Sequence, residues 1–513
     1  MVHNIRENSP STTDSSHCMA DGLFGDLDGI DDARDVQARE QTTLDKLIEV
    51  GNQMVAKYSQ VINNHTIKDY LKYMAMYIEL TQERLSEAQF NEEDLKNFIF
   101  YCVNHDYESS KAQAYGMYSG CLLQLLTERN KEQGKSTQFY IDGKGNRFDY
   151  LFCYANHVDE VRIVNFSGDY ICSFMGSFGG SANLIYGENL TGNFIFSNIG
   201  SYNSNINRIF GSHIKGNWAF SRIGTNGCNI NEVIGESIEG RGAFSAIGDH
   251  DYESENVCAV TKINRLIGIN IKGDNAFTIL GKNRSLITQL VLVGIEGNNL
   301  FLNDTSRTYP LVLNQLVAVG IKGNNAFRNI HKDVNIDQLI GVKVVGNNSF
   351  FNENIGQAII RQAIINGIEG DYTFSTETTG CAHNIDLLVG VNLHGNYAFS
   401  NHSFSSRNFL LFNCRGDGLF SNSDLSNSDV LYYNVYPPPS KTKNPYKSLH
   451  HIKDSVRVNR RGIKILRKAH FDEILTLAKS LEGKSYQEVL DIGEQLYALH
   501  PEPESMIHLQ LMR

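Results

Sequence analysis

The heptapeptide IKGNWAF at residues 214–220 returns as IEGRGAF at 238–244, IKGDNAF at 271–277 and IKGNNAF at 321–327. Each copy has a glycine at its third position, an isoleucine two positions before that glycine and a phenylalanine four positions after it. Self-similarity at a fixed interval is the sequence signature of a repeat protein, in which each unit packs mainly on its two neighbours. The surrounding chain can therefore be aligned on this glycine.

The anchor glycine recurs at intervals of about 24 residues, with one longer interval of 33 residues between Gly240 and Gly273. The aligned anchors are Gly168, Gly192, Gly216, Gly240, Gly273, Gly297, Gly323, Gly346, Gly370, Gly395 and Gly416. The phenylalanine column continues as Phe196, Phe220, Phe244, Phe277, Phe301, Phe327, Phe350, Phe374, Phe399 and Phe420, with Cys172 in the first unit. So short a period leaves no room for two helices per unit, and it favours several short strands.

These columns predict a parallel β-solenoid of about eleven coils over residues 150–425. Each coil adds about 4.8 Å along the axis, which gives a rod on the order of 50 Å long. The phenylalanines would then form an internal aromatic stack. The residue before the anchor alternates in charge over five coils, as Lys215, Glu239, Lys272, Glu296 and Lys322. Stacking in register explains this alternation, because like charges on adjacent strands destabilise a sheet.

Residues 150–425 therefore resemble right-handed parallel β-helix proteins in their repeat geometry. The resemblance rests on the glycine, aliphatic and phenylalanine columns, and no motif of a particular family accompanies it. Right-handedness is what the resemblance to this class implies.

Helical periodicity replaces the repeat on both sides of the solenoid. Apolar spacing over residues 36–135 predicts a small helical bundle, after an acidic, disordered tail at 1–35. Residues 436–445 form a proline-containing linker, and 446–513 form a basic C-terminal helical domain.

The C-terminal domain contains a predicted helical hairpin at 470–482 and 485–499. Ser485 and Glu488 have the spacing of a capping box at the start of the second helix. Because an open solenoid end exposes unpaired backbone groups, we expect the two helical units to cover the two ends of the rod.

Composition and cysteine usage indicate a compartment. The chain is acidic, with 57 Asp+Glu against 46 Lys+Arg. Its 8 prolines are too few for a collagen-like chain, and its middle is rich in asparagine. The first 35 residues lack a basic and an apolar signal-peptide region, and no apolar run approaches the roughly 18 residues of a membrane span. Nine scattered cysteines without C-x-x-C indicate neither disulfides nor zinc. We expect a cytoplasmic protein, or one exported by a system that needs no signal peptide.

The 33-residue interval contains an acidic insertion at 248–258. Its alternating carboxylates Asp249, Asp251, Glu253 and Glu255 are hard oxygen ligands suited to Ca²⁺. Asp249, His250, Asp251 and Glu253 are also the candidates for acid–base catalysis. The alternative is an ordinary solvated loop without cofactor, because the later glycine and bidentate glutamate of a calcium loop are missing.

A basic segment at 441–468 stands out in a chain of net charge −11. Its candidate anion-binding residues are Arg457, Arg460, Arg461, Lys464, Arg467 and Lys468. A basic amphipathic helix binds anionic membrane lipid, nucleic acid or an acidic partner. The alternative is that the segment docks on the protein's own acidic body or captures its acidic N-terminal tail.

The pattern favours a non-enzymatic scaffold or protein-interaction protein. Its repeat walls would be extended binding surfaces for another protein, and its helical domains would act as caps or partner-binding modules. The alternative is a carbohydrate-acting enzyme, similar to polysaccharide lyases or hydrolases, with a site near 248–258. Two carboxylates about 5–10 Å apart in a groove would favour the enzyme, and a flat, ungrooved wall would favour the scaffold.

Overall fold

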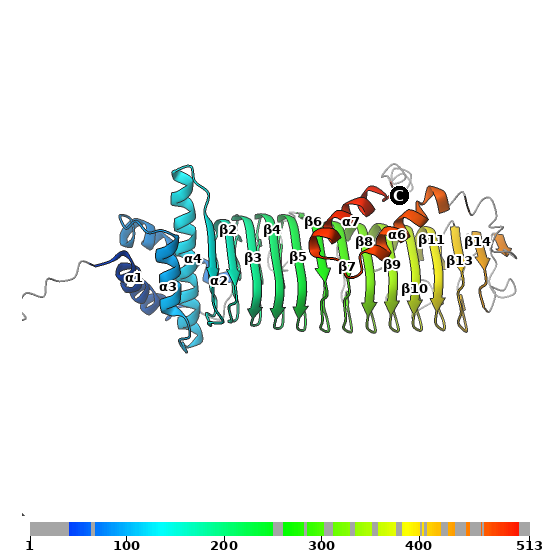
Figure 1. The fold of residues 1–513 in the computed structure, drawn as a ribbon, viewed down its shortest axis with the longest axis horizontal. Coiled ribbons are helices and arrows are strands. Elements are labelled where there is room, and N and C mark those ends of the chain that lie inside the picture. The colour runs from blue at the N-terminus through cyan, green and yellow to red at the C-terminus, as the bar shows by residue number, and fades with distance from the viewer. Residues whose placement is uncertain are drawn as a thin grey trace, which may run out of the picture.

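The computed structural model describes most of the chain between residues 41 and 501. The described residues are 41–62, 67–249, 260–281, 285–301, 311–328, 334–350, 358–375, 382–400, 403–404, 408–421, 429–436, 448–451, 463 and 466–501. A helical unit, a long parallel sheet and a C-terminal helical hairpin make up this part of the protein (Figure 1).

Within the described residues the sheet contains 15 strands, all paired in parallel, and neighbours follow chain order except that β11 pairs with both β12 and β13. The fold is therefore the predicted β-solenoid. The strands are β1 (Gln138–Asp142), β2 (His157–Val164), β3 (Ser181–Thr191), β4 (Asn205–Lys215), β5 (Asn229–Glu239), β6 (Thr261–Ile269), β7 (Ser285–Val293), β8 (Leu311–Lys322), β9 (Val334–Val345), β10 (Ala358–Glu369), β11 (Ala382–His394), β12 (Ser403–Phe404), β13 (Asn408–Phe412), β14 (Asp429–Tyr433) and β15 (Ser448–His451). Parallel strand pairing thus extends beyond the predicted solenoid range of 150–425 at both of its ends.

A coil consists of one long strand and a ribbon of consecutive turns, so the prediction of several short strands per coil is wrong. In the ribbon after β3 every second residue has a positive φ, as at Phe194, Phe196 and Asn198. The amide of Ser197 donates to the carbonyl of Phe194, which closes one of these turns. The amides of the positive-φ residues donate alternately to the following coil and to the preceding coil. Hydrogen bonds of the turns therefore join neighbouring coils, as those of the strands do.

The phenylalanine column forms the predicted internal stack. From Phe220 to Phe420 successive rings lie 4.5 to 5.6 Å apart between centroids, with interplanar angles of at most 15°. At the N-terminal end Phe196 meets Phe220 edge to face. Small residues in the strands make room for the rings: a Cβ at Gly268 would lie 2.5 Å from Cζ of Phe277.

The anchor glycines stack directly on one another. A Cβ on Gly216 would collide with the carbonyl oxygen of Gly192, and the same holds along the column as far as Gly416. Close backbone approach therefore requires glycine at this corner. Beside it, Glu239, Lys272, Glu296 and Lys322 are successive bridge partners, which confirms the predicted alternation of charge between neighbouring coils.

Four helices pack together on the first coils. They are α1 (Thr43–Tyr58), α2 (Ile67–Glu79), which continues into the π-helix η2 (Leu80–Arg84), α3 (Glu92–Cys102) and α4 (Ser109–Glu132). Helix α4 lies against the solenoid, where Gly116 and Gly120 allow the backbone at Tyr150 and Cys153 to approach. This unit covers the N-terminal end of the rod, as predicted (Figure 1).

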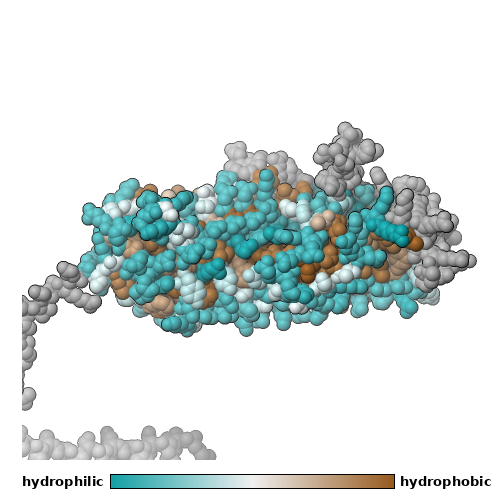
Figure 2. All heavy atoms as spheres, turned by 45° about the horizontal axis from the view of Figure 1, so that its top comes forward, coloured by the Kyte–Doolittle hydropathy of each residue, from teal (hydrophilic) through white to brown (hydrophobic). Residues whose placement is uncertain are grey.

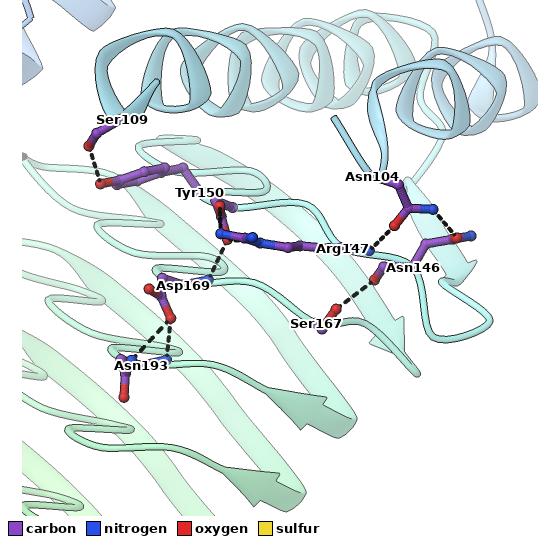
Figure 3. A network of polar contacts seen from close by, with 9 residues as sticks. Asn104, Ser109, Asn146, Arg147, Tyr150, Ser167, Asp169 and Asn193 are labelled. Carbon is purple, nitrogen blue, oxygen red and sulfur yellow. Dashed lines mark hydrogen bonds and ion pairs between the residues drawn. The ribbon is translucent and has the colours of Figure 1, made fainter. Parts of the chain in front are cut away.

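A polar network joins this cap to the first coils (Figure 3). The side chain of Asn104 accepts from the amide of Arg147 at 2.9 Å and donates to Asn146 at 2.6 Å. Further along, Oδ1 of Asp169 accepts from the amide of Asn193 at 2.7 Å. The residue after the anchor thus bonds to the backbone of the next coil.

The C-terminal hairpin lies on the flank of the rod. It consists of α6 (Phe471–Ser480) and α7 (Tyr486–Ala498), and it crosses the outward face of the sheet over the middle and later strands (Figure 1). The expectation that it covers the C-terminal end is wrong. The reason is an apolar outward face on β5–β10, which the hairpin buries.

Candidate functional site

An open groove of about 510 Å³ runs along the outer wall where strands β2–β6 begin. Six asparagines contribute most of its polar lining, together with one serine, one aspartate and one lysine. These residues are Asn183, Asn205, Asn207, Asn229, Asn231, Asn264, Ser181, Asp159 and Lys262. The groove is elongated along the solenoid axis because equivalent residues of successive coils line it.

Strand register explains why these side chains face outward. Residues 205 and 207 are two apart in β4, so they lie on the same face, with Ile206 turned to the core between them. The pairing of β4 with β5 passes from Ile206↔Ile230 to Arg208↔Glu232 and skips position 207. The pairings of β2–β3, β3–β4 and β5–β6 skip the equivalent position, so a column of asparagine side chains follows it.

The asparagines of this column form a continuous amide ladder. Nδ2 of Asn207 donates to Oδ1 of Asn183 at 2.9 Å, and Nδ2 of Asn231 donates to Oδ1 of Asn207 at 3.2 Å. Asn264 extends the ladder at 3.0 Å across the 33-residue interval. In the adjacent column Asn229 donates to Asn205 at 3.2 Å. The groove floor is therefore a fixed lattice of amide groups.

Among the lining residues that the structure describes, charge is confined to the two ends of the groove. Asp159 lies at the β2 end, where its Oδ2 accepts from the amide of Thr137 at 2.9 Å. Lys262 lies at the β6 end. The amides between them are neutral, so the middle of the groove offers hydrogen bonds without net charge.

The acidic insertion enters the chain beside this groove. It precedes β6, which begins at Thr261, next to the groove-lining Lys262. Asp249 is described, and its carbonyl accepts from the amide of Asn226 at 3.3 Å. The other candidates, His250, Asp251, Glu253 and Glu255, lie outside the described residues.

A carbohydrate-acting enzyme needs two carboxylates in the groove, and the described lining residues do not provide them. Among those lining residues Asp159 is the one carboxylate. Within the described ranges no three His, Cys, Asp or Glu side chains are grouped so that they could hold a metal ion. A groove is nevertheless present where the scaffold prediction expected a flat wall.

The basic segment is described only in part. Arg467 and Lys468 are exposed in a helical turn that leads into α6. Arg457, Arg460, Arg461 and Lys464 lie outside the described residues. None of the described helices combines the length and the hydropathy that crossing a membrane requires.

Sequence reasoning missed the amide lattice, although its signal was present. Asn183, Asn207, Asn231 and Asn264 follow the same intervals as the anchor glycines, 24, 24 and 33 residues. An alignment extended back from the anchor to the start of each strand would have found this column.

No protein-family model, no curated protein and no solved structure matches this chain. The chain has a β-solenoid fold, a repeat architecture that commonly serves as a scaffold.

Proposed function

We propose that this protein is a non-enzymatic scaffold that holds a partner along the amide-lined groove of its outer wall. The observation that carries the proposal is the lattice of six asparagines across β3–β6. The partner we favour is another protein, with the helical domains acting as caps or as additional binding modules.

Spare hydrogen-bonding capacity supports binding at this lattice. A primary amide has two N–H donors and two acceptor lone pairs. Asn207 uses one donor toward Asn183 and one lone pair toward Asn231, so one of each is left for a ligand. Because each amide is held by its neighbours, little side-chain entropy is lost when a ligand binds.

A photo-crosslinking experiment tests this proposal in cells. A benzoylphenylalanine at position 207 should give one discrete adduct, and the same group at the exposed position 345, which ends β9 and does not line the groove, serves as control. The N231R variant, which places a bulky charge in the next coil, should abolish that adduct. Identical adduct patterns from both positions, or none from position 207, would contradict the groove as a binding surface.

A carbohydrate-acting enzyme is the second candidate, because the acidic insertion enters beside the end of the groove. Incubation with neutral and acidic polysaccharides, followed by assays for new reducing ends and for unsaturated sugars, separates the two functions. The scaffold predicts no turnover. Turnover that is lost in a D251N/E253Q variant and kept in a D274N control would establish the enzyme instead.

We also propose that the basic segment 441–468 attaches the scaffold to an anionic surface. The exposed side chains of Arg467 and Lys468 support this proposal. Flotation with vesicles containing phosphatidylserine should show salt-sensitive binding that the R467Q/K468Q variant weakens. The same assay with a DNA duplex decides between lipid and nucleic acid, and docking of the segment on the protein itself predicts no binding to either.

A further inference from the structure

The outward face of strands β5–β10 has two apolar columns that side chains of the α6–α7 hairpin cover. The first column contains Ile234, Ile267, Val291, Val317, Ile340 and Ile364, and the second contains Ile269, Val293, Val319 and Val342. From the hairpin, Ile474, Ala478, Leu481, Val489, Leu490 and Leu496 pack on them. In the space-filling view, brown patches of other hydrophobic residues lie among hydrophilic ones along the rod (Figure 2).

A buried glutamine ladder lies beside these columns and binds the backbone of the hairpin. Nε2 of Gln289 donates to Oε1 of Gln315 at 2.7 Å and to the carbonyl of Gly493 at 2.7 Å. Nε2 of Gln315 donates in the same way to Gln338 at 2.6 Å and to the carbonyl of Leu496 at 2.9 Å. One N–H of each of these two amides thus donates to the next glutamine of the ladder, and the other donates to a backbone carbonyl of α7.

When the hairpin leaves the sheet, water can replace the hydrogen bonds between them, so no buried polar group is left unpaired. If α7 leaves, Gln289 and Gln315 keep their bonds within the ladder, and the second N–H of each becomes accessible to solvent. At the rim, Arg265 pairs with Glu494 at 2.7 Å, and Glu494 is 66% exposed. Exposed pairs of this kind contribute little stability, so apolar contact is what mainly holds the hairpin.

The hairpin is also a separate packing unit. It adds no strand to the sheet, and its apolar contacts form a cluster distinct from the one inside the solenoid. The chain joins it to the last described strand through residues 452–470. Its departure would therefore leave the internal phenylalanine stack and the strand pairing in place.

We propose that the outward face of β5–β10 is an exchangeable docking surface for an amphipathic helical hairpin. Helices α6 and α7 occupy it within one chain, and the same hairpin of a second copy occupies it when they leave. The second hairpin makes identical contacts, including the bonds from Gln289 and Gln315 and the Arg265–Glu494 pair. The surface thereby links two copies by exchange of their C-terminal hairpins.

The full chain with I474D tests the surface, because an aspartate at this fully buried position of α6 opposes docking within the chain. The matched control is T476D, which adds the same charge on the exposed side of α6. The probe is a fluorescent peptide of residues 466–501 with the natural sequence. We expect I474D to bind this peptide at least about tenfold more tightly than T476D or the unaltered protein, in which the attached hairpin competes.

Adding Q315L to I474D should make peptide binding weaker than in I474D alone, because one bond to α7 is lost. A folded I474D chain that does not bind the peptide overturns the proposal.

Hydrogen exchange of the unaltered protein supplies a measurement that requires no variant. If the hairpin leaves as a unit, the amides of α6 and α7 should exchange together and at least about tenfold faster than the amides of β7–β9. Equal exchange rates in the hairpin and in these strands would show that the hairpin does not leave as a unit.

Discussion

Replacement of Gly268 and Phe277, singly and together, tests the packing of the solenoid interior. A methyl group on Gly268 would lie 2.5 Å from Cζ of Phe277, so G268A overpacks the coil at an expected destabilisation of about 1–3 kcal/mol. The F277A change removes a ring that stacks on Phe244 at 4.7 Å and on Phe301 at 5.1 Å. Loss of this fully buried ring should destabilise by about 3–5 kcal/mol.

The double variant should be less destabilised than the sum of the two single ones. In F277A the space that the ring leaves accommodates the methyl group that G268A adds, so we expect a favourable coupling of about 1–3 kcal/mol. Urea unfolding followed by far-UV circular dichroism measures all four proteins. The control cycle pairs F277A with G187A, three coils away, and should be additive. Additivity in the Gly268 cycle would refute direct packing of ring against strand.

Three shorter predictions concern single sites. The chain has one tryptophan, whose ring covers Gly242, so G242A should displace the indole of Trp218 and shift the emission spectrum, because a Cβ would lie 2.6 Å from Cε3. Bonds from Lys484 and Ser485 lower the pKa of Glu488 to about 2. The stability that this carboxylate gives α7 should be fully present above its unfolded pKa of about 4.3 and be lost as the pH falls toward 2, which an NMR titration of Glu488 and helix amides would follow. Burial raises the pKa of Cys153 and Cys172 and encloses all six described cysteines, so a thiol reagent should label at most Cys18, Cys258 and Cys381 before denaturant is added.

The sequence was sufficient for the stacking of coils, because the decisive residues recur in fixed columns. Glycine at 192 and 216 and phenylalanine at 220 and 244 are required by contacts between equivalent positions of neighbouring coils. Such contacts repeat with the period of the chain, and the spacing therefore reveals them. The conformation within a coil was not predictable, because nothing in local propensity suggests a positive φ for residues such as Phe194 and Phe196.

The place of the C-terminal hairpin was missed for a different reason. An amphipathic face shows that a helix needs a partner surface but not which surface that is. The informative signal lay in the strands: LITQLVLV at 286–293 has apolar residues on both faces, which indicates burial on both sides. Gln289, Gln315 and Gln338 also repeat at intervals of 26 and 23 residues, so the column that binds α7 could have been found in the alignment.

The alternation of charge from Lys215 to Lys322 has a consequence for the evolution of this solenoid. Lys215 pairs with Glu239 at 3.5 Å and Glu296 with Lys322 at 2.9 Å, so the chemical unit along this edge is two coils long. A repeat protein gains or loses length by duplication and deletion of gene segments. Removing a single coil here would bring two lysines or two glutamates together, whereas removing two coils would restore the order. Within this stretch, a change of length by an even number of coils preserves the alternation of charge, and a change by an odd number interrupts it.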